Sequence, residues 1–333
     1  MTTSAVPVFT TEFGALYRGD CLAVLPQLEG STVDLVFADP PFNLGKSYAS
    51  GINDRLPETA YLDWCKRWID ECVRLLKPGG SFFLYNLPKW NLALGAYLNE
   101  RLTFRHWVAI EMTYSLPIVG RLYPSHYSLL YYCKGPKPAV FTPDRLPIVT
   151  CPHCHRELKD YGGYKDKMNP EGVNLTDVWK DIPPVRHRKF KRREEANELS
   201  IKLLDRVVRM ASKPGNLVLD PFGGSGTTYL VSELMRRRWI GTEIGPIDQI
   251  VDRLAAENQR IEQGFLDEYR SETNCLFPEN VQRERERRGI WVPGNIPKGR
   301  ARNGYAAVPE QSLMVLEEPA GSYRARKRKP KSA

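Results

Sequence analysis

Two hydrophobic patterns alternate along the chain. Short, continuous apolar runs are typical of strands buried on both faces, as the strands of parallel sheets are. We predict such strands at 15–18, 33–38, 81–85, 107–113, 127–133, 217–220 and 239–242. Between them, apolar residues recur every three or four positions, which indicates helices that pack one face on a sheet. We predict these helices at 22–28, 61–76, 90–99, 197–211, 229–234 and 250–269. The alternation predicts an α/β fold with a mostly parallel sheet.

The strand at 33–38 ends abruptly in Asp39, Pro40, Pro41 and Phe42. Proline has no backbone N–H with which to continue a ladder, so the two prolines end the strand. They leave a carboxylate, stiff backbone carbonyls and an aromatic ring at the carboxyl end of a parallel strand, where open α/β sheets place ligand sites. The alternative is a simple turn that caps the strand. The polar residues that follow are typical of a mobile loop beside a site.

A second strand end carries a glycine-rich turn. The strand's last residue and the turn are Asp220, Pro221, Phe222, Gly223, Gly224, Ser225, Gly226, Thr227 and Thr228. Strand, glycine turn and helix together bring backbone amides to a ligand at a helix N-terminus. No Gly-Lys-Ser/Thr ends the turn, so it is not a Walker loop. Glu243, about twenty residues beyond the glycines, is placed to accept hydrogen bonds from ribose hydroxyls; the alternative is a surface acid.

Asp20 also follows a predicted strand. Because the carboxyl ends of parallel strands meet at one edge of a sheet, we expect Asp20 at the same edge as Asp39. The alternative role for Asp20 is to cap the short helix that begins next.

Composition sets outer limits on the class of protein. A chain of 333 residues with 42% hydrophobic and 26% charged residues is expected to form one large α/β domain with appendages. No apolar run reaches the ~20 residues that span a bilayer, and residues 1–7 lack the features of a signal peptide. Seven cysteines, mostly in apolar segments, favour reduced thiols in the cytoplasm. The net charge of +9 admits a polyanionic partner.

The middle of the chain changes character. Residues 136–184 are rich in proline and contain Cys151 and Cys154, a Cys-x-x-Cys pair that is half of a structural zinc site. The sequence contains no second such pair, so we predict no metal and a turn with two reduced cysteines. Zinc completed by a histidine, by Cys133 or by a second subunit is the alternative.

A basic run follows at 185–193, with one aromatic residue inside it. Such runs are usually solvated, but its position between the two halves of the predicted site favours contact with phosphates. The predicted phosphate-contacting residues are Arg186, Arg188, Lys189, Lys191, Arg192 and Arg193. From about residue 278 the chain is rich in Arg, Glu, Pro and Gly with little periodicity, which predicts a disordered, basic tail.

With both motifs in view, the chain resembles the S-adenosylmethionine-dependent DNA amino-methyltransferases, and among them the beta group, in which the catalytic motif precedes the cofactor loop. The likeness covers about residues 16–257. It implies a seven-stranded, mostly parallel, Rossmann-like sheet with helices on both faces and a circularly permuted motif order. It also implies four parts: a catalytic half at 1–135, a target-recognition insertion at 136–193, a cofactor-binding half at 194–277 and the tail at 278–333.

The resemblance implies a role for each motif. Asp39, Pro40, Pro41 and Phe42 match the catalytic tetrapeptide, and the glycine-rich turn matches the cofactor loop through Phe222, Gly224 and Gly226. Glu243 matches the acid that binds the cofactor's ribose, and Asp20 matches the acid that meets its adenine. The implied cofactor is S-adenosyl-L-methionine.

The implied chemistry suits these residues. The amine of a DNA base is a poor nucleophile because its lone pair is delocalised into the ring. A carboxylate (Asp39) and a carbonyl (Pro40) would accept its two hydrogens and direct the lone pair at the sulfonium methyl. Phe42 would stack on a base flipped out of the duplex.

We therefore predict site-specific methylation of the N6 amine of adenine in double-stranded DNA. Methylation of the N4 amine of cytosine and a catalytically silent DNA-binding modification subunit are the alternatives. A cognate restriction endonuclease and a second copy of the chain are further candidate partners, and we expect no membrane association.

Overall fold

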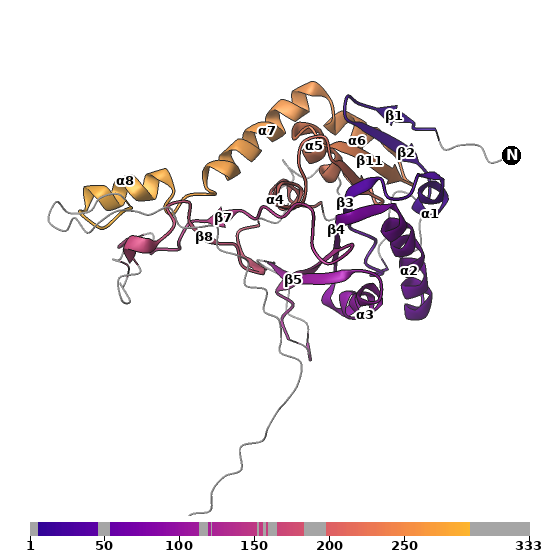
Figure 1. The fold of residues 1–333 in the computed structure, drawn as a ribbon, viewed down its shortest axis with the longest axis horizontal. Helices are drawn as coiled ribbons and strands as arrows, with labels where there is room; N and C mark the ends of the chain where they lie inside the picture. The colour runs from indigo at the N-terminus through magenta and orange to yellow at the C-terminus, as the bar shows by residue number, and fades with distance from the viewer. Residues whose placement is uncertain are drawn as a thin grey trace, which may run out of the picture. The chain divides into compact units, whose positions relative to one another are not determined.

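A nine-stranded sheet forms the centre of the computed structural model (Figure 1). The structure describes residues 6–45, 54–112, 119–120, 122–151, 153–155, 158, 165–182 and 198–293. The strand order is β1-β2-β11-β10-β3-β4-β6-β5-β9. These strands are β1 (Phe9–Thr10), β2 (Gly14–Arg18), β3 (Val33–Ala38), β4 (Leu76–Asn86), β5 (Thr103–Glu111), β6 (His126–Cys133), β9 (Val178–Trp179), β10 (Leu217–Asp220) and β11 (Arg238–Glu243). A separate two-stranded ribbon pairs β7 (Arg145–Leu146) with β8 (Val173–Asn174).

The predicted α/β class and mostly parallel sheet are confirmed. Strands β2, β11, β10, β3 and β4 run parallel to one another, β1 is antiparallel to β2, and β6 is antiparallel to both β4 and β5. The strand count is nine rather than the predicted seven. The two additional strands, β1 and β9, are edge strands of two residues each, too short to produce a hydrophobic period in the sequence.

Helices pack on both faces of this sheet. They are α1 (Cys21–Val24), α2 (Glu58–Leu75), α3 (Pro88–Asn99), α4 (Ile201–Ala211), α5 (Thr227–Leu234), α6 (Asp248–Arg253), α7 (Ala256–Ser271) and α8 (Glu279–Arg287). The alternation along β3 shows the two layers. Leu35 and Phe37 join the apolar cluster that contains residues of α4, α5 and α7. Val36 and Ala38 join the cluster built on α1, α2 and α3. Because both faces are covered, the central strands are apolar throughout, as predicted.

Two predictions about the end of the chain differ from the structure. The helix predicted at 250–269 is two helices, α6 and α7, separated at Leu254 and Ala255. The region from 278, predicted to be disordered, begins with α8. This helix is highly charged, with Glu and Arg paired three and four residues apart, so it has little hydrophobic period to read from the sequence. Residues 294–333 lie outside the described residues.

The α8 segment packs on part of the predicted insertion. Phe277 and Val292, on either side of the helix, form a small apolar cluster with residues such as Ile148 and Met168. The fully buried Arg285 of α8 donates a hydrogen bond to the His155 carbonyl oxygen (2.9 Å). The insertion and the chain after α7 therefore share one small core.

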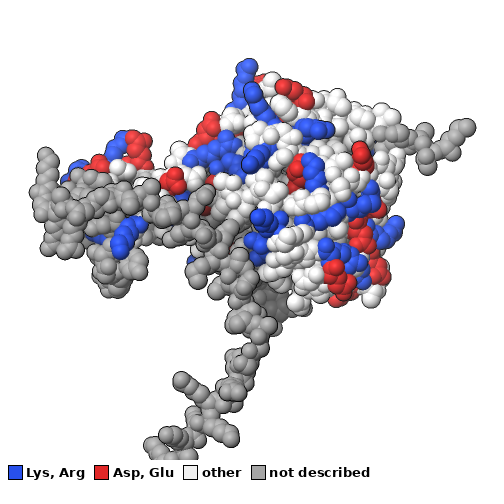
Figure 2. Space-filling view, in the orientation of Figure 1, with Lys and Arg blue, Asp and Glu red and all other residues white. Residues whose placement is uncertain are grey.

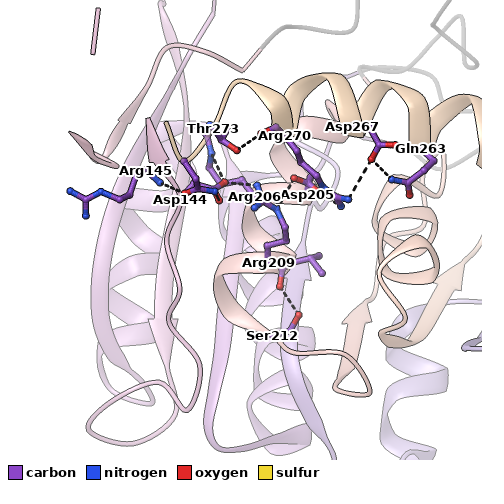
Figure 3. A network of polar contacts seen from close by, with 12 residues as sticks. Asp144, Arg145, Asp205, Arg206, Arg209, Ser212, Gln263, Asp267, Arg270 and Thr273 are labelled. Atoms are coloured by element: carbon purple, nitrogen blue, oxygen red, sulfur yellow. Dashed lines mark hydrogen bonds and ion pairs between the residues drawn. The ribbon is translucent and has the colours of Figure 1, made fainter. Parts of the chain in front are cut away.

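Ion pairs hold both ends of the predicted insertion to α4, and Figure 3 shows the network at its entry, around Asp144. At the entry, Asp144 accepts a hydrogen bond from Arg209 (2.6 Å). At the exit, the carboxylate of Asp181 accepts two from Arg206 (2.5 and 3.0 Å). Helix α4 directly precedes β10, so the same element that carries these charges also positions the glycine-rich turn.

On the face shown in Figure 2, the charged side chains of the described residues lie in mixed groups, with Lys and Arg beside Asp and Glu. Exposed pairs such as Lys66–Asp63 and Lys89–Glu58 are examples, and each contributes little to stability. Among the described ranges, no helix combines the length and the apolar character that crossing a bilayer requires.

Candidate functional site

Four acidic residues follow four neighbouring parallel strands at one edge of the sheet. In the order β2, β11, β10 and β3, they are Asp20, Glu243, Asp220 and Asp39. Strand register keeps the ends level, because Glu243 pairs with Arg18, and Leu219 pairs with Val36. Within the described ranges, none of the four acids forms an ion pair with Lys or Arg. This edge, called the acidic rim below, therefore has no lysine or arginine counter-charge among the described residues.

Burial raises the proton affinity of both central acids. Burial, and then the nearby Asp220, raise the pKa of Asp39 well above its usual range. Burial also raises the pKa of Asp220, to about 7, and Glu243 adds to this rise. The Thr228 hydroxyl and the Phe222 N–H (2.9 Å) oppose it by donating hydrogen bonds to the Asp220 carboxylate. A cation placed at this rim would relieve the unfavourable ionisation.

The backbone after Asp39 is held by side chains from other elements. The Tyr61 hydroxyl donates a hydrogen bond to the Pro41 carbonyl (2.7 Å), and the Trp90 indole N–H donates one to the Phe42 carbonyl (2.8 Å). Asp54 accepts the N–H of Asn43 (2.7 Å). No described residue donates to the Pro40 carbonyl. The tetrapeptide therefore offers one open carbonyl beside the Asp39 carboxylate.

Aromatic rings line the chain next to this open carbonyl. The Phe42 ring lies 6.0 Å from Tyr85 and 5.8 Å from Tyr127, measured between ring centroids, and these two tyrosines are 5.2 Å apart. Tyr85 is buried and Phe42 is half-buried. Rings in this arrangement form an apolar wall suited to a flat, aromatic ligand.

The glycine-rich turn is held by Glu243. One carboxylate oxygen accepts the Gly224 N–H (2.8 Å), and the other accepts the Gly245 N–H (2.7 Å). Gly224 has a φ of +52°, and a Cβ placed there would meet no atom closer than 3.9 Å. Gly226, with a φ of +76°, is the N-cap of α5, and its Cβ would lie 3.0 Å from Ile250. Gly224 therefore faces open space, whereas Gly226 allows α6 to approach the turn.

Other residues of the turn point away from the open side. The hydroxyls of Ser225 and Thr227 accept hydrogen bonds from Arg253 of α6 (3.1 and 2.8 Å). Thr242 donates to the Pro221 carbonyl (2.6 Å). Because the hydroxyls of Ser225 and Thr227 are engaged by Arg253, only the backbone of these two residues is available to a ligand. Their role in cofactor binding stays a prediction.

Phe222 connects the turn to the catalytic half of the sheet. Its ring packs against Trp68 (5.0 Å between centroids) and Trp64 (5.7 Å), both on α2. The same helix carries Tyr61, which holds the tetrapeptide. Helix α2 thus contacts both sequence motifs and fixes their separation.

Asp20 takes the alternative role considered from the sequence. Its side chain accepts the Leu22 N–H (2.9 Å) and caps α1. Asp20 is exposed and stands at the acidic rim next to Glu243, whose carbonyl accepts the Gly19 N–H (2.9 Å). The cap uses one carboxylate oxygen and leaves the other available.

For two groups of predicted residues, the basic run and the cysteine pair, the described residues do not define a binding site. The basic residues Arg186–Arg193 lie outside the described residues. Cys151 and Cys154 are exposed free thiols, and the described ranges contain no group of three side chains able to hold a metal ion. The absence of zinc stays a prediction.

Several residues that shape the site were missed from the sequence. Tyr61 was predicted only as part of a core-facing helix, and Trp90 as the start of another. Their rings are buried, at 2% and 5% exposed, but their polar tips reach the tetrapeptide. A buried Tyr or Trp needs a partner for its O–H or N–H, and that requirement is the signal that could have marked them.

Comparison with known proteins gives consistent matches. Residues 33–251 match a family described as DNA methylase, of the N6/N4 type. The chain is 54% identical over 286 residues to the type II methyltransferase M.BamHI of Bacillus amyloliquefaciens, a match that covers 86% of this chain and 67% of that protein. It is 31% identical over 250 residues to the DNA adenine methyltransferase YhdJ of Escherichia coli (strain K12), covering 73% and 83%.

Among solved structures, the fold is similar to that of the PvuII DNA methyltransferase, whose title describes it as cytosine-N4-specific. The TM-score is 0.56 at 20% sequence identity, over 78% of this chain and 93% of that one. At this identity the likeness concerns the fold.

The raised pKa of Asp220 predicts how Asp220→Asn changes stability. Between the ordinary Asp pKa and pH 7 the native state binds more protons than the unfolded chain, so ∂ΔG/∂pH of unfolding is negative. The contribution of this group is present below about pH 4 and is lost as the pH rises through about 7. Asn keeps the acceptor for Phe222 but does not titrate. Urea unfolding at about pH 5 to 8 measures the free energy of unfolding. The value for the variant should rise relative to that for the wild type as the pH rises.

Asp63→Asn, at an exposed side chain of α2, is the control and should show a constant difference from the wild type. A pH-independent difference between Asp220→Asn and the wild type would contradict the assignment of an unfavourable buried carboxylate.

Proposed function

The chain belongs to the DNA methylase family, and we propose that it methylates the exocyclic amine of a base at a specific site in duplex DNA. Membership makes it an S-adenosylmethionine-dependent DNA methyltransferase of the N6-adenine or N4-cytosine type. The observation that carries the proposal is the pair of open acceptors, the Asp39 carboxylate and the Pro40 carbonyl, beside an acidic rim and a glycine-rich turn.

The residues at the rim fit this cofactor. S-adenosylmethionine supplies an electrophilic methyl group on a positively charged sulfonium. Asp220 has no lysine or arginine partner among the described residues, so a cationic ligand close to it would favour its ionised form. The open side of Gly224 admits a close approach to the backbone, and Glu243 retains lone pairs for ribose hydroxyls. These residues, with Asp20 and Phe222, would hold the cofactor.

The chain's own groups would activate the target amine by position and charge. With the Asp39 carboxylate accepting one amine hydrogen and the Pro40 carbonyl accepting the other, the amine's lone pair is withdrawn from the ring and directed out of the base plane. Phe42, Tyr85 and Tyr127 would hold the flat base and exclude water from it. No covalent intermediate is needed, since orientation and electrostatics supply the acceleration. A base reaches such a site only after leaving the duplex.

The target base is the finer part of the proposal. The tetrapeptide begins with Asp, which resembles the tetrapeptide of the adenine enzymes and favours adenine N6 as the target. The amine of cytosine presents the same two hydrogens to the same two acceptors, which makes cytosine N4 the second candidate.

Contact with DNA is proposed for the segments that carry the positive charge. Residues 183–197 contain six Lys or Arg against two Glu, and residues 294–333 contain nine against three Glu. The resulting charges, +4 and +6, exceed the net charge of +9 for the whole chain, so the other residues together carry a net charge of −1. Counterion release from phosphates would then come mainly from these segments, including Arg188 and Lys189. A cognate restriction endonuclease, self-association and a cytoplasmic location belong to the same proposal.

The direct test of the proposal is methyl transfer to DNA. Purified protein incubated with labelled S-adenosylmethionine and plasmid DNA should give a methylated nucleoside, identified by chromatography as N6-methyladenine or N4-methylcytosine. Asp39→Ala should abolish transfer and leave cofactor affinity within a few-fold by equilibrium dialysis, because Asp39 serves the amine. Asp63→Ala is the control, and it should transfer at the wild-type rate. A product on RNA or protein but not on DNA would contradict the proposal.

The glycine-rich turn offers a matched pair of variants. Gly224→Ala and Gly215→Ala both place a Cβ in open space at a positive φ (+52° and +82°), so both introduce strain of ~1–2 kcal/mol. Only Gly224 lies in the proposed cofactor site. By calorimetry, Gly224→Ala should weaken S-adenosylmethionine binding about tenfold or more, and Gly215→Ala should bind normally. Equal affinities would remove the turn from the cofactor site.

A further inference from the structure

We infer that Tyr61 is a positioning residue for the transfer reaction, acting through the Pro41 carbonyl to fix the open Pro40 carbonyl and the Asp39 carboxylate at the target amine. The inference rests on the proposed function. It adds to that function a residue from another element, helix α2, which would touch neither base nor cofactor but would set the geometry of the groups that do.

The hydrogen bond that carries the inference is short and buried. Tyr61 is 2% exposed, and its hydroxyl lies 2.7 Å from the Pro41 carbonyl oxygen. Burial keeps the pKa of the phenol far above its usual range, so Tyr61 remains a neutral donor throughout the working pH range. The bond spans twenty residues of sequence, from α2 to the tetrapeptide.

Asn86 fixes the direction of this bond. Its side-chain N–H₂ donates to the Tyr61 oxygen (3.0 Å), while its carbonyl oxygen accepts the Leu87 N–H (2.7 Å). Since the side-chain oxygen of Asn86 is engaged by Leu87, the Tyr61 proton is directed at Pro41. Asn86 is fully buried at the end of β4, a neighbour of β3 in the sheet. Two hydrogen bonds, from Asn86 to Tyr61 and from Tyr61 to Pro41, thus connect the end of β4 to the chain after β3.

The flanking backbone is held as firmly. Trp90 engages the Phe42 carbonyl, and Asp54 engages the N–H groups of Asn43 (2.7 Å) and Leu44 (3.1 Å). Asn43 itself has a φ of +56°, a left-handed conformation that Asn tolerates and that these bonds maintain. The hydrogen bonds of Tyr61, Trp90 and Asp54 all involve backbone groups that follow Pro40. The Pro40 carbonyl is left for a ligand, and its direction is determined by the anchored residues on one side and β3 on the other.

Small movements at such a site have large effects on rate. Misplacing a catalytic group by about 1 Å can reduce a rate by up to ~100-fold, whereas the loss of one buried neutral hydrogen bond away from the site lowers stability and leaves the rate unchanged. A positioning role therefore predicts a fall in kcat with little change in binding. A merely structural role predicts a loss of stability with kcat retained.

The chain contains a matched control for Tyr61. Tyr132 is also buried, at 1% exposed, and its hydroxyl also bonds a backbone carbonyl, that of Gly95 (3.0 Å). Its hydroxyl also lies 2.9 Å from the side-chain oxygen of Asn99, a second acceptor, whereas Tyr61 receives a hydrogen bond from Asn86. None of these partners belongs to the tetrapeptide or to the acidic rim.

The experiment compares Tyr61→Phe, Tyr132→Phe and the wild type in full-length protein. Steady-state methylation of plasmid DNA gives kcat, calorimetry gives the affinity for S-adenosylmethionine, filter binding gives the affinity for DNA, and urea unfolding gives stability. Tyr61→Phe should lower kcat by about 10- to 100-fold with both affinities within about twofold. Tyr132→Phe should lose similar stability and keep kcat within about twofold.

A second variant guards against a folding defect. Trp90→Phe removes the donor to the Phe42 carbonyl and should also lower kcat selectively; combined with Tyr61→Phe, the losses should be less than additive because both act on one peptide. Equal kcat values for Tyr61→Phe and Tyr132→Phe would overturn the inference, as would a loss of Tyr61→Phe activity explained by weaker cofactor or DNA binding. Inactive wild-type protein would instead refute the proposed function, so the two failures are distinguishable.

Discussion

The withdrawal of carboxylates from water at one sheet edge is the constraint on which the site depends. Asp220 is buried and Asp39 is half-buried at the ends of neighbouring strands, and no lysine or arginine among the described residues neutralises them. Burying uncompensated charge is costly, and the raised pKa values of both groups record that cost. A protein keeps such an arrangement where a ligand supplies the missing charge. In the proposed function, the cofactor would bring the positive charge that Asp220 lacks among the described residues.

The rim also separates two tasks. Towards β10 and β11, Glu243 and the glycine-rich turn form a surface where backbone approaches a ligand closely. Towards β3, the tetrapeptide presents Asp39 and one open carbonyl beside aromatic rings. Helix α2 packs on both, through Tyr61 on one side and Trp64 and Trp68 on the other. The distance between the methyl donor and the amine would thus be set by one rigid helix.

Much of this arrangement could be predicted from the sequence, and the remainder had identifiable causes. The apolar strands and their polar ends placed Asp39 and Asp220 correctly, because parallel strands have a strong local pattern and a common end. Strands β1 and β9 were missed because two residues carry no period. Helix α8 was missed because its stability comes from Glu–Arg pairs and from distant apolar contacts of Phe277 and Val292. Tyr61 looked like any core tyrosine, since the carbonyl it binds becomes its neighbour only when the sheet has formed.

The central claim, that the acidic rim receives a cation, is tested most directly by proton release on cofactor binding. Calorimetry at about pH 7 in buffers of different ionisation enthalpy measures the protons released when S-adenosylmethionine binds. Parallel titrations with S-adenosylhomocysteine, which lacks the sulfonium charge, provide the comparison. The account predicts more protons released with the sulfonium, because its charge lowers the raised pKa of Asp220. Equal proton release by the two ligands would show that the rim does not respond to the cofactor's charge, and would contradict the account.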